Sequence, residues 1–476
     1  MTVPAAPRLE ALVDALAAGL LEREVPVRLA LLGALAGEHL LLIGPPGTAK
    51  SELARRLHRA FADAPYFERL LTRFSTPEEL FGPLSLKALE ADRYERLTAG
   101  FLPTAGIAFL DEVFKANSAI LNTLLTLLNE RLFDNGSGRV AVPLISVVGA
   151  TNELPADDAL AAFFDRFLLR VPVAPVSDAA FAALLRLDPA AAPAMPAPLQ
   201  RTERQAWARE AADLLLGDDV LTACAALRHW LAERGQSLSD RRWRQCIGLM
   251  RMAAATEGRP AVDALDLWLA PYVAAVDTSR MPDQVQALSD WVDAELVHAV
   301  PQDAPWLTHA VEAFEAQLQL EQTARDEQLD DGSAGKLALA RAIAGGHEDL
   351  EGGAPRLVSA ALADSQRRRY SRVHVAARVA QMDELIAHAT AERDTVAAQA
   401  ADLAQRLAGR VWLPPSFADR WRAAHQHTLS VLEGLLHRAR AAQGGFAGLP
   451  LQTGEIEPDE AAAASATPAP VAWARP

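Results

Sequence analysis

The chain has 476 residues, of which half are hydrophobic, and a formal net charge of -15. This length exceeds what one ordinary hydrophobic core accommodates, so we expect two to four domains. The acidic balance argues against a general polyanion-binding protein, which usually shows a basic face. The two cysteines, Cys224 and Cys246, are too few for a disulfide scaffold and fit a reducing compartment, so we predict a cytoplasmic protein.

The N-terminal stretch is apolar but is interrupted by Glu10, Asp14 and Glu22. It has no basic region followed by a clean apolar core, so we predict no signal peptide. No run of 18 apolar residues occurs, which predicts no membrane-spanning helix. Peripheral membrane contact stays open on this evidence.

The first third of the chain alternates between helical and strand-like patterns. Leucines and alanines at three- and four-residue spacing predict helix over residues 8–36. After them, short apolar runs typical of strands alternate with helical runs in the order HLLLIG, SELARRLHRAFA, IAFLDE, SAILNTLLTLLNERLF and LISVVGATN. This alternation predicts a parallel α/β sheet.

Two segments of this region have the pattern of hairpins. LSLKALEADRYERLT, residues 84–98, has two strand-like arms around a polar turn. RLFDNGSGRVAVP, residues 131–143, carries an Asn-Gly turn signal. We expect both to interrupt the α/β alternation.

The rest of the chain is mostly helical in pattern, apart from a proline- and alanine-rich stretch, LDPAAAPAMPAPLQ, and a tail rich in alanine and proline that we predict to be disordered. We expect an α/β nucleotide-binding subdomain (1–187), a linker (188–202), a helical lid (203–285), a first helical part (286–335), a small α+β insert (336–380), a second helical part (381–440) and the tail (441–476).

The stretch GPPGTAKS, residues 44–51, follows a predicted strand and opens a predicted helix, the context of a phosphate-binding loop. Lys50 can reach the β- and γ-phosphates of a nucleotide, and Ser51 can hold Mg²⁺. The usual glycine before the lysine is replaced by Ala49. We expect Ala49 near the first helical turn at negative φ, where alanine gains roughly 1 kcal/mol of helix propensity over glycine. An ordinary strand-turn-helix is the alternative.

Three further positions fit nucleotide chemistry. Asp111 and Glu112 end a buried strand, so that one acid can help hold Mg²⁺ and the other can polarise the attacking water. Asn152 ends another strand and could align that water. Arg166 ends a helix, from which an arginine can reach a neighbouring subunit. Taken singly, each has a plainer alternative: a helix-capping acid, a turn residue, or a surface ion pair between Asp165 and Arg166.

The order of these features resembles the AAA+ ATPase module, and is most similar to its MoxR branch and, within it, to the RavA-type ATPases. The resemblance covers roughly residues 10–280 and is carried by GPPGTAKS, TRFSTPEELFGPLS, RYERLTAGFLP, FLDEVFKANSAILNTLLTLLNER, NELP and SDRRW. The family also has alanine before the lysine, so Ala49 is a family variant of a working loop.

The resemblance implies a set of residue roles with ATP and Mg²⁺ as cofactors. Arg241 and Arg242 compete for the role of sensor 2. Whether that arginine acts on the nucleotide of its own subunit or of the next one stays open. The implied assignments are Gly44, Pro45, Pro46, Gly47, Thr48, Ala49, Lys50 and Ser51 for the Walker A loop, Asp111 and Glu112 for Walker B, Ser51 and Asp111 for Mg²⁺, Asn152 for sensor 1, Arg166 for the arginine finger and Arg241 for sensor 2.

The resemblance also implies a hexameric ring, since the arginine finger must come from the next subunit. It implies a protein client, remodelled or chaperoned, and a von Willebrand factor A-domain (vWA) partner. In RavA-type proteins a substantial domain interrupts the helical stalk, whereas here only about 45 residues do. A partner recognised by that full insert, such as the lysine decarboxylase of some members, is therefore in doubt.

Two alternative functions remain at this level. One is a DNA-acting motor, against which the acidic charge and the lack of a basic hairpin argue, so we expect no specific nucleic acid. The other is a nucleotide-gated binding scaffold. The basic cluster QRRRYSRVH, residues 366–374, could contact anionic lipid, nucleic acid or an acidic partner, or could be a solvated edge.

Overall fold

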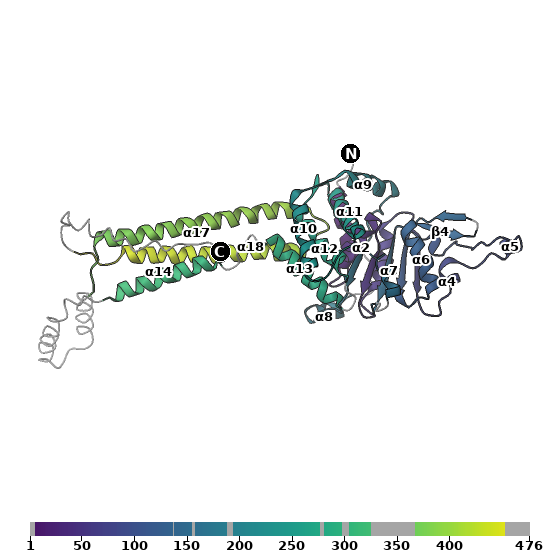
Figure 1. The fold of residues 1–476 in the computed structure, drawn as a ribbon, viewed down its shortest axis with the longest axis horizontal. Coiled ribbons are helices and arrows are strands. Elements are labelled where there is room, and N and C mark those ends of the chain that lie inside the picture. The colour runs from purple at the N-terminus through teal and green to yellow at the C-terminus, as the bar shows by residue number, and fades with distance from the viewer. Residues whose placement is uncertain are drawn as a thin grey trace, which may run out of the picture. The chain divides into compact units, whose positions relative to one another are not determined.

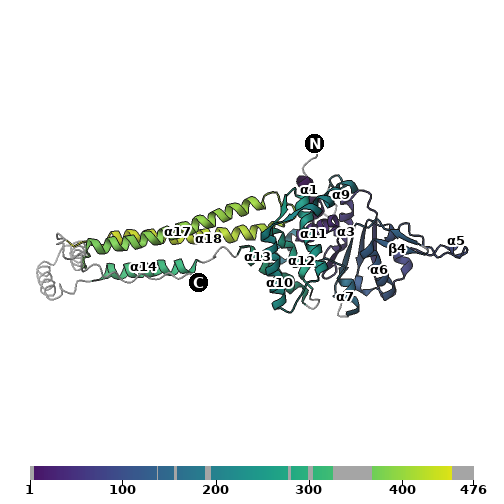
Figure 2. The same ribbon diagram turned by 45° about the horizontal axis from the view of Figure 1, so that its top comes forward.

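The structure, a computed structural model, describes residues 5–136, 138–154, 158–187, 194–276, 280–297, 304–324 and 367–452. The chain forms two compact units (Figures 1 and 2). The first unit comprises Met1–Ala299 together with Gln405–Trp421, and the second comprises Val300–Ala404 together with Arg422–Pro476. The sequence predicted neither that a late segment returns to the first unit nor where it does so.

The centre of the first unit is a five-stranded sheet in the order β2-β3-β6-β1-β7, in which all neighbouring strands are parallel. Parallel sheets are covered on both faces, so their central strands are apolar, and β1 and β6 are buried throughout. The predicted α/β class is confirmed. The strands are β1 (Leu40–Ile43), β2 (Tyr66–Leu70), β3 (Ile107–Asp111), β6 (Ser146–Thr151) and β7 (Leu169–Pro172).

The two edge strands, β2 and β7, have no counterpart among the predicted strands. β2 carries charged residues, and β7 contains Arg170, which is only 1% exposed. The Arg170 guanidinium donates to Phe164 O, Phe167 O and Ala275 O and lies 3.9 Å from the centre of the Phe164 ring. A buried arginine with such partners breaks the apolar pattern by which a strand is recognised.

The helices around this sheet are short (Figure 1). The single helix predicted over 8–36 is in fact two, because Gly19 and Glu22 adopt positive φ in the turn between them. The helical elements are α1 (Ala5–Ala17), α2 (Glu24–Ala36), α3 (Lys50–Leu57), α4 (Pro77–Phe81), α6 (Ser118–Glu130), α7 (Asp158–Phe164) and α8 (Asp178–Leu185), with 3-10 turns at His58–Ala60, Leu102–Thr104 and Val113–Lys115.

One of the two predicted hairpins forms. β4 (Leu132–Asn135) pairs antiparallel with β5 (Gly138–Ala141), as the Asn-Gly signal indicated. The prediction of strand arms over 84–98 is wrong: the chain folds back through an isolated bridge between Leu84 and Arg96, but one arm is the helix α5 (Leu86–Leu89). The Ser85 hydroxyl caps that helix by accepting from Ala88 N, which favours helix over strand.

The lid is helical as predicted, with one pair of two-residue strands added. Two boundaries differ from the prediction. α9 begins at Arg201, inside the predicted linker, and α13 belongs to the first unit although residues from 286 were assigned to the next domain. The elements are α9 (Arg201–Asp213), β8 (Leu215–Leu216), α10 (Asp218–Glu233), α11 (Asp240–Thr256), β9 (Ala261–Val262), a 3-10 helix η4 (Ala264–Leu269), α12 (Ala270–Ala274) and α13 (Met281–Val297).

Residues 405–421, which we call the anchor segment, are bonded into the first unit. Arg410 forms ion pairs with Asp263 and with Asp266, the latter at 3.0 Å. The Trp412 ring is 1% exposed, and its Nε1 donates to Thr256 Oγ1 at 2.8 Å. Further bonds run from Arg28 to Val411 O and from Trp412 N to Glu257.

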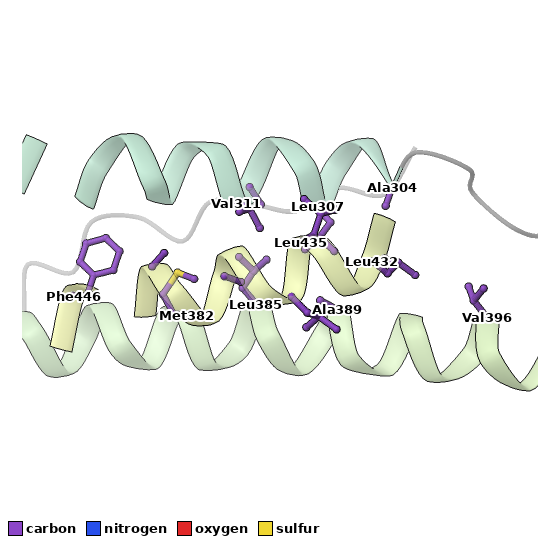
Figure 3. Packing of buried hydrophobic residues seen from close by; sticks show 14 of the residues in the cluster. Ala304, Leu307, Val311, Met382, Leu385, Ala389, Val396, Leu432, Leu435 and Phe446 are labelled. Atoms are coloured by element: carbon purple, nitrogen blue, oxygen red, sulfur yellow. The ribbon is translucent and has the colours of Figure 1, made fainter. Parts of the chain in front are cut away.

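The second unit is built on three helices that share one apolar core. α14 (Pro305–Thr323), α17 (Arg372–Leu407) and α18 (Pro415–Ala447) bury residues at alternating spacings of three and four, the pattern of a coiled-coil seam. Figure 3 shows Leu307 and Val311 of α14 facing side chains of the other two helices. Residues of α17 up to Ala404 and of α18 from Arg422 belong to this unit.

The predicted boundaries in the second half are partly wrong. Residues 372–380, assigned to the insert, begin α17, and residues 441–447, assigned to the tail, end α18. Both ranges carry apolar residues at helical spacing, and these side chains pack into the core of the three-helix bundle. Most of the predicted insert and residues 453–476 lie outside the described residues, as does Gln366 of the basic cluster. Within the described part of the chain, no helix is long and apolar enough to cross a membrane.

Replacing Arg410 by methionine should loosen the anchor segment. The change removes a guanidinium that is 3% exposed from the buried carboxylate of Asp266, so we expect local opening of residues 405–421 to become easier by about 2 kcal/mol. Amide hydrogen exchange of that segment measures this directly. Arg393→Met is the control, because Arg393 pairs with Asp394 at the surface, and it should change exchange by less than about 0.5 kcal/mol. Equal effects of the two variants would contradict the anchor.

Candidate functional site

The loop at residues 44–51 connects β1 to α3 at the edge of the sheet where the strands end. Gly44 N donates to Thr151 O at the end of β6, and a Cβ on Gly44 would lie 2.0 Å from Val173 O. Only glycine therefore allows the loop to pass so close to the end of β7. Gly47 adopts φ 80°, a left-handed conformation that glycine accepts without strain.

Ala49 does not have the conformation that we predicted. It is the N-cap of α3 with φ 64° and ψ 23°, in the left-handed region, and not a residue of the first turn at negative φ. The loop makes its last bend at this residue, and the helix begins at Lys50. Alanine in this region costs roughly 1–2 kcal/mol, so the expected gain in helix propensity is absent. Backbone strain of this size is typical of functional loops.

Lys50 is folded toward its own loop. Its Nζ donates to Gly44 O at 2.8 Å and to Pro45 O at 2.7 Å. Partial burial lowers the pKa of Lys50, and the nearby carboxylates of Asp111 and Glu112 oppose that shift. A cation in this position, beside the loop's amides, can bind phosphate oxygens.

Arg23 is a residue of the site that the sequence did not suggest. Its side chain is buried, and its guanidinium donates to Thr48 O of the loop at 3.2 Å and to Ala174 O after β7 at 2.6 Å. It thus joins the loop to the segment that follows the last strand. Burial lowers the pKa of Arg23. The only sequence signal is a charged triplet, Glu22 to Glu24, inside an apolar stretch.

Asp111 and Glu112 lie at the same edge of the sheet. Glu112 has φ 51° and ψ 45°, and its N–H donates to Asp111 Oδ1 at 3.0 Å. Its Oε2 is buried without a hydrogen-bond partner, although Lys115 Nζ lies 3.3 Å away. The left-handed backbone at Glu112 is of the kind found at functional sites, and the Glu112 carboxylate can accept a hydrogen bond from water.

Asn152 comes directly after β6, and its side chain is exposed. Because β6 lies between β1 and β3 in the sheet, the position after its last residue lies between the loop and the two acids. The structure therefore brings Lys50, Asp111, Glu112 and Asn152 to one edge. Their strands are not consecutive in the chain, and parallel pairing alone aligns their ends.

Arg166 lies at the opposite edge. It precedes β7, whose first residue Leu169 is paired with Leu40 at the start of β1, whereas the loop follows the end of β1. A strand of this length separates the two edges by roughly 13 Å. Arg166 Nε is buried and has no hydrogen-bond partner among the residues that the structure describes. The alternative of a surface pair with Asp165 is not seen, since Asp165 pairs with Arg170 and Arg242.

Arg241 and Arg242 have different environments. Arg241 is exposed and donates to Asn129 Oδ1 at 3.2 Å, near the end of α6. Two residues after Asn129, Arg131 donates to Gly37 O, which lies just ahead of β1. Asn129 and its partner Arg241 therefore lie at the edge of the sheet where the strands begin. Arg241 is therefore on the far side of the sheet from the loop of its own chain.

Arg242 is committed to holding the lid. Its guanidinium is 2% exposed and donates to Asp165 Oδ1 at 3.2 Å, Leu168 O at 2.9 Å and Val273 O at 2.6 Å. These partners come from the sheet side and from α12, so the contact fixes α11 against both. Burial lowers the pKa of Arg242, and Asp165 opposes the shift. A side chain with these partners is not available to a nucleotide.

The site fits an anionic phosphate group with Mg²⁺. The first amides of α3 have no side-chain cap, and such free amides at a helix N-terminus bind anions. Ser51 and Asp111 offer oxygen ligands of the kind that Mg²⁺ prefers. In the described residues, no group of three or more His, Cys, Asp or Glu side chains could hold a metal ion.

Replacing Ala49 by glycine should stabilise the protein. Glycine removes the left-handed strain but adds freedom to the unfolded chain, so we expect unfolding to cost about 0.5–1 kcal/mol more. Thermal unfolding without nucleotide measures the change. Ala54→Gly, within the same helix at an ordinary helical position, should instead lower stability by about 1 kcal/mol. A destabilised Ala49→Gly protein would contradict the positive φ.

Comparison with known proteins identifies the module. A family model described as the MoxR domain of MoxR–vWA–β-propeller ternary systems matches residues 7–197, and an AAA lid model matches residues 219–286. Two uncharacterized proteins of Methanocaldococcus jannaschii are 39% and 41% identical over 268 and 262 residues, which are 56% and 54% of this chain and 70% and 69% of theirs.

A solved structure of an ATPase candidate from Cytophaga hutchinsonii is also similar in part. It is 15% identical, with a TM-score of 0.49, over 60% of this chain and 94% of that one. This likeness is too weak to support an argument, and the assignment depends on the family models and the sequence relatives. On that basis, the chain belongs to the MoxR family of AAA+ ATPases.

Proposed function

We propose that this protein hydrolyses ATP at sites shared between adjacent subunits of a ring, the hexamer that its resemblance implies, and uses the energy to remodel a protein client. The observation that carries the proposal is the division of the site across the sheet. The loop and the acids lie where the strands end, and Arg166 and Arg241 lie where they begin. A chain cannot bring its own two edges together, whereas two copies can.

Within one subunit, the chain would bind the nucleotide and prepare the water. The amides of α3 and Lys50 would hold the phosphates, and Arg23 would keep the loop in place through Thr48 O. Ser51 and Asp111 would hold Mg²⁺, which neutralises charge that develops on the phosphates. Glu112, whose Oε2 has no hydrogen-bond partner among the described residues, would polarise a water that Asn152 helps to align.

The neighbouring subunit would supply positive charge. Among the described residues, Arg166 Nε has no hydrogen-bond partner, and the exposed Arg241 donates to the side chain of Asn129. We infer that Arg166 acts as the finger and Arg241 as sensor 2, both on the nucleotide of the next subunit. Because Arg242 is buried and donates to Asp165, Leu168 O and Val273 O, we infer that it does not take the second role.

The partner that we propose is a vWA-domain protein. The support is the description of the matching family model, which places such MoxR domains in ternary systems with a vWA and a β-propeller component. The RavA-type assignment is a narrower proposal. Most of the predicted insert lies outside the described residues, so this proposal depends on the sequence resemblance and on the three-helix second unit.

Glu112→Gln should bind ATP but hydrolyse it at least about 100-fold more slowly. The amide keeps the shape of the side chain and removes the carboxylate that accepts the proton of water. Binding of a fluorescent ATP analogue and steady-state phosphate release measure the two properties. Asp111→Asn is the comparison, because it should weaken Mg²⁺-dependent binding. If Asp111→Asn retained ATP without hydrolysis while Glu112→Gln stayed active, the roles of the two acids would be reversed.

Mixing two inactive variants should restore activity if sites are shared. Lys50→Ala loses the charge that faces the phosphates, and Arg166→Ala loses the finger. An Arg166→Ala subunit still offers an intact loop to the finger of a Lys50→Ala neighbour. At equal mixing, about a quarter of the interfaces are complete, so activity should approach that fraction of wild type when sites act independently.

The control for this experiment pairs Lys50→Ala with the double variant Lys50→Ala/Arg166→Ala, which cannot form one complete site. Subunit exchange is first confirmed by labelling the two proteins differently. No recovery of ATPase activity in rings shown to be mixed would count against Arg166 acting on the next subunit. Full activity of Arg166→Ala alone would remove it from the site.

A further inference from the structure

The surface helix α8 and the two residues after it expose an unusual amount of apolar side chain. Phe181 is 52% exposed, Leu184 39%, Leu185 71% and Leu187 37%, and no residue of α8 is buried. Apolar side chains normally turn one face of a surface helix toward the core. No face of this helix packs against the rest of the described chain. Exposed apolar patches of this kind mark sites of interaction with another surface.

The start of α8 is fixed beside the nucleotide loop. Ser177, its N-cap, donates through its N–H to the carboxylate of Glu22 at 2.8 Å, and its hydroxyl bonds the same group. Arg23, which follows Glu22 in the chain, donates to Thr48 O of the loop and to Ala174 O, three residues before Ser177. The helix therefore leaves the sheet at the edge that carries the loop.

The copy that completes the site must approach this same edge. Under the function proposed above, on which this inference depends, a neighbour brings Arg166 and Arg241 to the loop from the edge where its strands begin. We propose that α8 docks on that neighbouring copy, with Phe181, Leu184 and Leu185 as its apolar contact. The surface that positions the arginines is then continuous with the apolar surface that holds the two copies together.

The composition of α8 favours a protein occupant. Between Asp178 and Arg186 the helix has no charged residue, and charge depletion is typical of the centre of protein interfaces. Helices that lie on membranes usually carry several lysines or arginines on the polar face, and α8 has none within its bounds. Burying these side chains against a second copy would remove apolar surface from water, which favours assembly.

Leu185→Glu tests this contact. We expect it to abolish ATP-induced assembly and to reduce ATPase activity at least about tenfold, while the isolated subunit keeps wild-type ATP-analogue binding and circular dichroism. Light scattering with size exclusion reports assembly. Leu320→Glu is the matched control, because Leu320 on α14 is also 71% exposed and should assemble normally. Wild-type assembly of Leu185→Glu, or equal loss in both variants, would overturn the proposal.

A photocrosslinking residue at position 185 identifies the occupant. We expect a product of two copies of this chain in the presence of ATP, joined near the edge of the neighbour that carries Arg166. A crosslink confined to the same chain, to its C-terminal residues for example, would overturn the inference. If wild type itself neither assembles nor hydrolyses ATP, the proposed function fails. If wild type does both and position 185 makes no contact between copies, only the role of α8 fails.

Discussion

The parallel pairing of β1, β3 and β6 is the constraint on which the site depends. It aligns the ends of three strands that are far apart in the chain, and so places Lys50, Glu112 and Asn152 at one edge. The same pairing makes the opposite edge the place where Arg166 lies, since β7 begins beside β1. The direction of the strands therefore separates the groups proposed to bind a nucleotide from the arginines proposed to act on one.

Strain and burial accompany this arrangement. Ala49 and Glu112 both have left-handed backbones, one before Lys50 and one after Asp111. The surrounding structure must hold such conformations, and here Gly44 and the buried Arg23 fix the loop to the ends of β6 and β7. Arg242 does the same for the lid. Buried arginines such as Arg23 and Arg242 thus serve as framework in this module.

The sequence predicted the parts whose pattern is local. The apolar runs of β1, β3 and β6 and the Asn-Gly turn after β4 were recognised because periodicity and turn chemistry identify them. The strand β7 was missed because Arg170 interrupts its apolar pattern, and the partners that make a buried charge possible are distant in sequence. The φ of Ala49 was missed because no pattern shows where a loop makes its last bend. The partners of Arg241 and Arg242 depend on how the lid packs, which neighbouring residues do not determine.

The anchor segment has a consequence for how this protein could be divided. The regions shared with the family models end near residue 286, which invites truncation after the lid. Such a fragment would lack Arg410 and Trp412, leaving the carboxylates of Asp266 and Glu257 buried with fewer partners and uncovering an apolar surface. The module is thus not autonomous at its apparent boundary. The anchor segment lies more than a hundred residues downstream of that boundary. The first unit is therefore built from two separate stretches of the chain, with part of the second unit between them in sequence.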